Sequence, residues 1–148
     1  WRIIMPYRVL SKKEAGIIAA MGSGVIPRGG RNFTLGAADL EDKWLIRTDY
    51  LLSRMPLPTR LGLKLAVRVL NYGWPLMYFR KFKALTSMDE QERTELFHVI
   101  ESSRFPGSMS ILIVKVLVFP AFYGLAEAKE AIGYQEKFPN PEFEGLKD

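Results

Sequence analysis

Few residues in this sequence could carry out chemistry. The 148-residue chain contains one histidine, His98, and no cysteine. Cysteine nucleophiles and thiolate metal sites are therefore excluded, and a lone histidine disfavours a Ser-His-Asp triad or a histidine metal site. Glu127 and Glu130 are at helical spacing, but no base or metal ligand accompanies them, so we interpret them as a solvated helix face. We expect no catalytic residue, no cofactor-binding residue and no metal ligand.

A short glycine motif, Gly22-Ser23-Gly24, has the composition of part of a phosphate-binding loop. However, no strand pattern precedes it and no GxxG completion follows it, and a phosphate loop needs both. We interpret the two glycines as the C-terminal end of the first helix.

Positive charge is concentrated in the middle of a chain whose net charge is +5. No acidic residue lies between Tyr50 and Met88, and the basic residues of that segment are Arg54, Arg60, Lys64, Arg68, Arg80, Lys81 and Lys83. Arg60, Lys64 and Arg68 recur every four residues and form a stripe opposite Leu63, Val67 and Leu70. Two interpretations stay open. The stripe is either a solvated helix face or, together with Arg80, Lys81 and Lys83, a surface that binds anionic lipid or an acidic partner. Nucleic-acid binding is not predicted, because no recognition motif is present.

Helix signals recur along the chain, and no stretch alternates with a two-residue period. Ser11 and Glu14 have capping-box spacing and predict the start of the first helix. A second helix is predicted from 37 to 55, and a third from 59 to about 72, where Gly73-Trp74-Pro75 breaks the pattern. A second capping box at Ser87–Glu90 predicts a helix that runs to Ser102, with Leu96, Phe97 and Ile100 facing inward.

The longest apolar run extends from Met109 to Leu125. Because Pro120 cannot continue a helix without a kink, we expect two helices that meet at Phe119–Pro120. They are apolar on nearly all sides, which predicts burial together with surplus apolar surface. The sequence thus predicts an all-α fold: one compact domain of about six helices over residues 1–134, and an extended tail over 135–148.

A resemblance rests on a series of features in a fixed order. These are the Leu51–Pro58 turn, the helix leading into Trp74-Pro75-Leu76, Phe82, the capped Met88–Arg93 helix, Ser102-Ser103-Arg104, the apolar helix with Lys115, Tyr123, and the ending Ala131-Ile132-Gly133-Tyr134. This order resembles the helical region that precedes the flavin domain in long-chain alcohol oxidases and related glucose–methanol–choline (GMC) oxidoreductases. The earlier segment LSKKEAGIIAAMGSGVIP is similar to the start of the small subunit of gluconate 2-dehydrogenase-type enzymes, which pair with a GMC flavoprotein.

The resemblance implies a non-catalytic small subunit that stabilises or docks a larger GMC-type, FAD-dependent oxidoreductase with an alcohol, sugar or sterol-like substrate. No strand followed by GxGxxG is present, so FAD is expected in the partner and not in this chain. We expect contacts with the partner at Arg104, Phe119, Tyr123, Ile132, Tyr134, Phe138 and Phe143.

The alternative is a peripheral membrane-binding helical module that acts without an enzyme partner. The basic residues and the apolar helices would then bind lipid. Either interpretation favours a location in the cytoplasm or at a membrane surface. Because the sequence begins at Trp1, a removed leader stays open.

Overall fold

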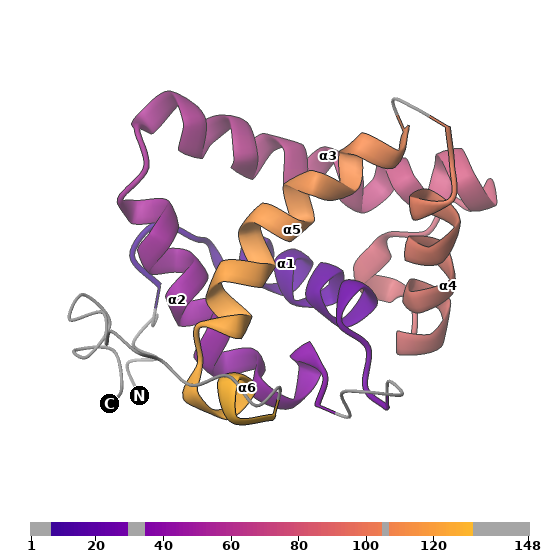
Figure 1. Ribbon diagram of the computed structural model, residues 1–148. Helices are drawn as coiled ribbons and strands as arrows, with labels where there is room; N and C mark the ends of the chain where they lie inside the picture. The colour runs from indigo at the N-terminus through magenta and orange to yellow at the C-terminus, as the bar shows by residue number, and fades with distance from the viewer. Residues whose placement is uncertain (1–6, 30–34, 105–106, 132–148) are drawn as a thin grey trace, which may run out of the picture.

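The computed structural model describes residues 7–29, 35–104 and 107–131. These residues form six α-helices and two short 3-10 helices, and they contain no strand (Figure 1). The predicted all-α class is therefore confirmed. In chain order the elements are α1 (Lys12–Val25), η1 (Ala37–Leu40), α2 (Glu41–Ser53), α3 (Leu57–Phe79), η2 (Leu85–Ser87), α4 (Glu90–Glu101), α5 (Gly107–Tyr123) and α6 (Ala126–Ala131).

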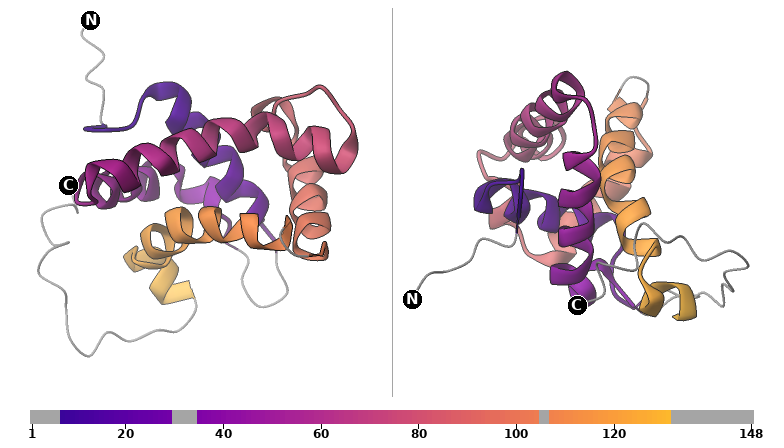
Figure 2. Two further views of the ribbon diagram at one scale, coloured as in Figure 1. Left: turned by 90° about the horizontal axis from the view of Figure 1, so that it is seen from above. Right: turned by 90° about the vertical axis from the view of Figure 1, so that its left-hand side faces the viewer.

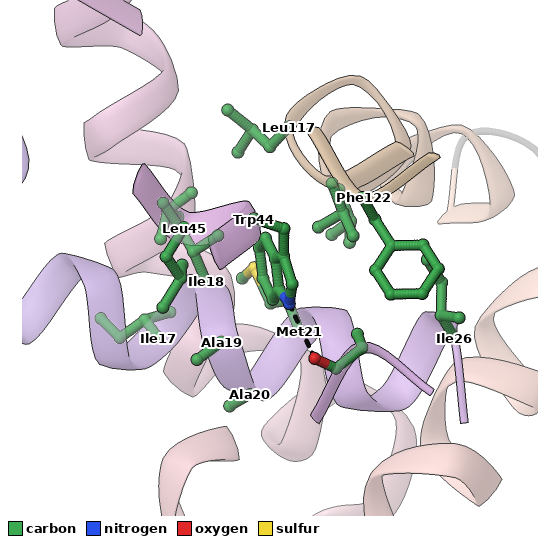
Figure 3. Close-up of a cluster of buried hydrophobic side chains, with 14 of the residues drawn as sticks. Ile17, Ile18, Ala19, Ala20, Met21, Ile26, Trp44, Leu45, Leu117 and Phe122 are labelled. Carbon is green, nitrogen blue, oxygen red and sulfur yellow. Dashed lines mark hydrogen bonds between the residues drawn. The ribbon is translucent and has the colours of Figure 1, made fainter. Parts of the chain in front are cut away.

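Helix α1 lies at the centre and packs against α2, α3, α4 and α5. Helix α3 runs along the top of the molecule in Figure 1, and α5 crosses the front of the molecule. The core between α1, α2 and α5 is built around Trp44, which is fully buried with Met21 and Phe122 (Figure 3). The indole Nε1 of Trp44 donates a hydrogen bond to the carbonyl oxygen of Ala37 at 2.7 Å, so the one polar atom of this ring is satisfied.

The first helix begins as the sequence predicts. The Glu14 amide donates to the Ser11 hydroxyl at 3.1 Å, and the Ser11 amide donates to the Glu14 carboxylate at 2.9 Å, which completes the capping box. The helix ends close to the predicted place, because Gly22 and Gly24 lie in the last turn of α1, which continues to Val25. Both glycines are buried contact points: a Cβ on Gly22 would lie 2.6 Å from the Trp44 ring, and one on Gly24 would lie 2.3 Å from the Phe97 ring.

Helix α3 is longer than predicted at both ends. It starts at Leu57, with Pro58 in its first turn as expected, and it runs through Gly73-Trp74-Pro75 to Phe79. Packing explains why the predicted break does not occur. The buried Trp74 ring lies edge-on to Phe97 at 5.3 Å between centroids and donates to the Ser110 hydroxyl at 3.0 Å, so tertiary contacts offset the hydrogen bond that Pro75 removes.

The predicted division of the apolar run at Phe119–Pro120 is also wrong. Helix α5 continues through Pro120 to Tyr123, and α6 begins only at Ala126. Pro120 is exposed, and so is Val116, whose carbonyl would otherwise accept a hydrogen bond from residue 120. Water can satisfy that carbonyl, which lowers the penalty of a proline in the last turn.

Two other boundaries differ slightly from the prediction. The predicted second helix, 37–55, consists of η1 followed by α2. Helix α4 is capped by Asp89, whose side chain accepts from the Glu92 amide at 2.8 Å, whereas Ser87 belongs to η2. The capping box predicted at Ser87–Glu90 does not form, because Asp89 supplies the cap of α4. The predicted inward residues of α4, Leu96, Phe97 and Ile100, are all buried.

Three backbone amides of the segment before α1 bind a single carboxylate. Asp49 on α2 accepts hydrogen bonds from the backbone amides of Arg8, Val9 and Leu10, at 2.6, 3.0 and 2.9 Å. Asp49 is 2% exposed, so these three amides replace the water that a buried carboxylate loses.

Candidate functional site

The most unusual surface of the described residues is the outward side of α3. Seven apolar side chains are exposed along it, and they recur every three to four residues over most of the helix. We call this stripe the α3 face: Leu57, Leu61, Leu65, Val69, Tyr72, Leu76 and Met77. The exposed fraction is 63% for Leu65 and 72% for Met77. A solvent-facing helix side is ordinarily polar, so an apolar stripe of this length indicates a binding surface.

The position of α3 leaves this face accessible. In the view from above, α3 lies over α1 on the side of the viewer (Figure 2). Its opposite side, which includes Val67, Asn71 and Trp74, is buried in the core. The sequence pattern placed Leu63, Val67 and Leu70 opposite the basic stripe, and the outward apolar stripe was not predicted. The four-residue spacing of Leu57, Leu61, Leu65 and Val69 indicates a second apolar stripe, although it does not show which of the two stripes the core covers.

The predicted basic stripe does not form a solvated face. The buried carboxylate of Glu14 lies 2.8 Å from the Arg68 guanidinium and 3.3 Å from the Lys64 ammonium. Lys64 also donates to the Val9 carbonyl at 2.8 Å. Both cations extend from one edge of α3 toward α1, beside Val67 and not opposite it, so they attach α3 to α1 while Arg68 stays half-exposed.

The environment of Glu14 perturbs its protonation. Burial by itself would raise the pKa of Glu14, but the Ser11 amide and the cations of Lys64 and Arg68 outweigh burial and lower the pKa below its ordinary value. The carboxylate is therefore charged at neutral pH. This cluster is fully paired, and it stabilises the contact between two helices.

The other predicted basic residues lie at the two ends of the α3 face. Arg60 is half-buried in the first turns of α3. Arg80 ends the helix in the left-handed conformation, with φ 52°, and is exposed. Lys81 and Lys83 follow it and lie 3.8 and 3.4 Å from the carboxylate of Glu92 on α4. Between these lysines, the Phe82 side chain is 96% exposed.

A second apolar surface lies on α5, whose opposite side belongs to the core. Met109, Leu112, Val116 and Pro120 are exposed along it. Phe119 and Tyr123 are half-buried beside them and stack edge-to-face at 5.5 Å between centroids. Burial raises the pKa of Tyr123. We call these six residues the α5 face.

Three of the seven predicted partner-binding residues are within the described residues. Phe119 and Tyr123 belong to the α5 face, and the exposed Arg104 lies just before α5, where its carbonyl accepts from the Gly107 amide at 3.0 Å. Ile132, Tyr134, Phe138 and Phe143, together with the predicted tail 135–148, lie outside the described residues.

The described residues contain no group of three or more histidine, cysteine or carboxylate side chains that could hold a metal ion. His98 is exposed on α4. Glu127 is not simply solvated, because it pairs with Lys43 of α2, and this hydrogen bond is the main cause of its lowered pKa. A narrow, mainly apolar hollow beneath α3 is lined by Leu10, Ile18, Leu63, Val67 and Leu117 together with the paired Glu14 and Lys64.

Within the described ranges, no helix combines the length and apolar character needed to cross a bilayer. Comparison with known protein families, curated proteins and solved structures finds no match to this chain.

Proposed function

We propose that this chain is a non-catalytic accessory subunit that docks onto a larger GMC-type, FAD-dependent oxidoreductase through the α5 face. In this role the partner holds FAD and performs the chemistry on an alcohol, sugar or sterol-like substrate. This chain stabilises or positions the flavoprotein.

The observation that carries the proposal is the two-sided apolar character of α5. Val114, Val118 and Phe122 face the core and are fully buried, so one side of the helix is sufficient to complete the domain. The other side exposes Met109, Leu112 and Val116 to solvent. Contiguous apolar surface that folding does not bury is typical of protein–protein interfaces, whose centres are apolar and aromatic.

The resemblance supports the choice of partner. Phe119 and Tyr123 are within the segment that resembles the helical region of GMC oxidoreductases, and they share the α5 face with the exposed residues. In the fused relatives this end of the helical region leads directly into the flavin domain. The same face is therefore the one expected next to a flavoprotein when the two parts are separate chains.

The direct test is to purify the chain from its native source and to examine the co-purifying polypeptides for bound flavin by absorbance. We expect a yellow, FAD-containing polypeptide in a fixed ratio to this chain. Recovery of the chain without any flavoprotein would overturn the proposal.

A pair of double variants then tests the surface. Replacing Leu112 and Val116 with glutamate should weaken the complex tenfold or more, because two charges would be buried against an apolar partner. The matched control replaces Leu61 and Leu65 of α3 with glutamate and should leave the affinity for the flavoprotein unchanged. Both pairs are exposed, so circular dichroism should be unaffected.

A further inference from the structure

We propose that the α3 face docks this protein onto anionic phospholipid bilayers, with α3 lying in the plane of the membrane interface. This inference goes beyond the proposed function and does not depend on a flavoprotein partner. It rests on a different helix and on a different combination of apolar surface and charge.

The first step is the geometry of the face. Helix α3 has 23 residues and is therefore about 34 Å long, at a rise of 1.5 Å per residue. Its exposed apolar side chains extend from Leu57 in the first turn to Met77 in the last, and its inward side is fixed to α1 and α4. Of the sides of α3, the outward stripe is the one that the described residues leave uncovered. A helix that presents one long apolar side lies along a bilayer surface with that side among the acyl chains.

The second step is the charge around the face. Residues 51–88 contain seven basic residues and no acidic one. Arg54 is exposed next to the start of α3, Arg68 lies at its edge, and Arg80, Lys81 and Lys83 follow its end. Two carboxylates from other helices approach these cations: Glu14 is buried beneath Arg68, and Glu92 pairs with Lys81 and Lys83. The exposed cations Arg54, Arg68 and Arg80 therefore lie at the start, edge and end of the helix that bears the face, which suits a negatively charged lipid surface.

Aromatic side chains complete the pattern. Tyr72 lies within the stripe at 56% exposure, and Phe82 projects into solvent between two lysines. Tyrosine prefers the level of the lipid headgroups, where its ring is in an apolar environment and its hydroxyl is in a wet one. Phe82 can enter the acyl region while Lys81 and Lys83 remain among the phosphates.

The same features disfavour a second copy of the chain as the occupant. Two α3 faces in contact would bring cations together in either direction of packing, because Arg80 of one copy would approach Arg80 of the other in a parallel pair and Arg54 in an antiparallel pair. Like charges at an interface oppose association. The face also belongs to a single helix that runs along the top of the molecule (Figure 1). A broad, deformable and negative surface fits it best.

The test uses flotation of the full chain with phosphatidylcholine vesicles, with and without phosphatidylserine. We expect binding to the phosphatidylserine vesicles that decreases as salt is added, and little binding to phosphatidylcholine alone. Leu65→Glu with Leu76→Glu should reduce binding at least tenfold. The control pair on the α5 face, Leu112→Glu with Val116→Glu, has comparable exposure and should bind as the parent does.

Charge is tested separately by Lys81→Gln with Lys83→Gln. A cation near an anionic leaflet strengthens binding about fivefold, so the double variant should bind roughly 25-fold more weakly at low salt and should lose part of the salt dependence. Equal binding of the parent and the variant would show that these charges do not contribute to vesicle binding, and it would overturn the proposal.

A pair of labelled variants reports insertion without relying on charge substitutions. Because the chain has no cysteine, Val69→Cys on α3 and Val116→Cys on α5 can each carry one environment-sensitive dye. Phosphatidylserine vesicles should shift the emission of the dye at 69 to the blue and leave that at 116 unchanged. The proposal is overturned if neither dye responds, if only the dye at 116 responds, or if the α3 face instead mediates a dimer that Leu65→Glu dissociates in solution.

Discussion

The carboxylate of Glu14 on α1 lies 2.8 Å from the guanidinium of Arg68 on α3, although 54 residues separate them in the chain. Glu14 is almost fully buried, whereas Arg68 is half-exposed. The same carboxylate completes the capping box of α1 and pairs with Lys64. One side chain therefore both starts the first helix and attaches the third helix to it.

We predict that Glu14→Ala destabilises the domain by roughly 1.5–3 kcal/mol, the range for hydrogen bonds that involve charged groups. The substitution removes a helix cap and leaves Lys64 near the core without its anion. Urea unfolding followed by circular dichroism measures the effect. The control is Glu95→Ala, an exposed glutamate on α4, which should change stability by less than about 0.5 kcal/mol. Equal effects of the two substitutions would contradict the role assigned to Glu14.

Stability should also depend on pH through Glu14. Its pKa is lowered in the folded protein from an ordinary value of 4.5. The unfolded chain therefore takes up the proton first as the pH falls, and the folded state loses this stabilisation as the pH passes from the ordinary value down through the lowered one. The free energy of unfolding should decrease with acidification over that window. Glu14→Gln should flatten the decrease, and a parallel pH profile for the variant would refute the assignment.

The sequence predicted those features that depend on neighbouring residues. The Ser11–Glu14 capping box, the inward residues of α4 and the all-α class follow from local spacing. The second role of Glu14 could not be read in this way, because Lys64 and Arg68 lie 50 or more residues further along the chain. Which cation meets a buried carboxylate is decided by how helices pack, and local periodicity does not report it.

Breaks in helices were overpredicted for a related reason. Pro75 and Pro120 carry an intrinsic penalty within a helix, but the burial of Trp74 and the exposed position of Pro120 make both tolerable. The α3 face presents the opposite problem. Helix α3 has apolar residues on both its inner and its outer side, so the pattern alone cannot show which side the core covers.

Glycines inside α1 give a prediction with an internal control. Gly22→Ala should destabilise the domain by about 1–3 kcal/mol, because the new methyl group would lie 2.6 Å from the Trp44 ring and force the core to shift. Gly16 is in the same helix, and apart from its own neighbours along the helix backbone no atom lies within 4 Å of the corresponding position. Gly16→Ala should therefore stabilise the domain by about 0.5–1 kcal/mol through helix propensity. Thermal unfolding that ranks the two variants in the reverse order would contradict the packing described here.

The last prediction concerns Asp49, which holds the segment before α1. Its two carboxylate oxygens accept hydrogen bonds from the backbone amides of Arg8, Val9 and Leu10. Among the described residues, no other side chain accepts a hydrogen bond from these amides. Asp49→Ala leaves the three donors without this acceptor; Leu10 is buried although Arg8 is exposed, and an unsatisfied buried donor costs about 1–3 kcal/mol. The segment can move outward to reach solvent, so we expect a loss of stability near the lower end of that range, together with faster hydrogen exchange at these amides.

The control is Asp42→Ala, which replaces an exposed aspartate on the same helix. Because the amides themselves are observed, the experiment separates a local release from a global loss of stability. Faster exchange confined to residues 8–10 identifies Asp49 as an anchor of this segment. Unchanged exchange there would show that the packing of Leu10 and the hydrogen bond from Lys64 to Val9 are sufficient to hold it.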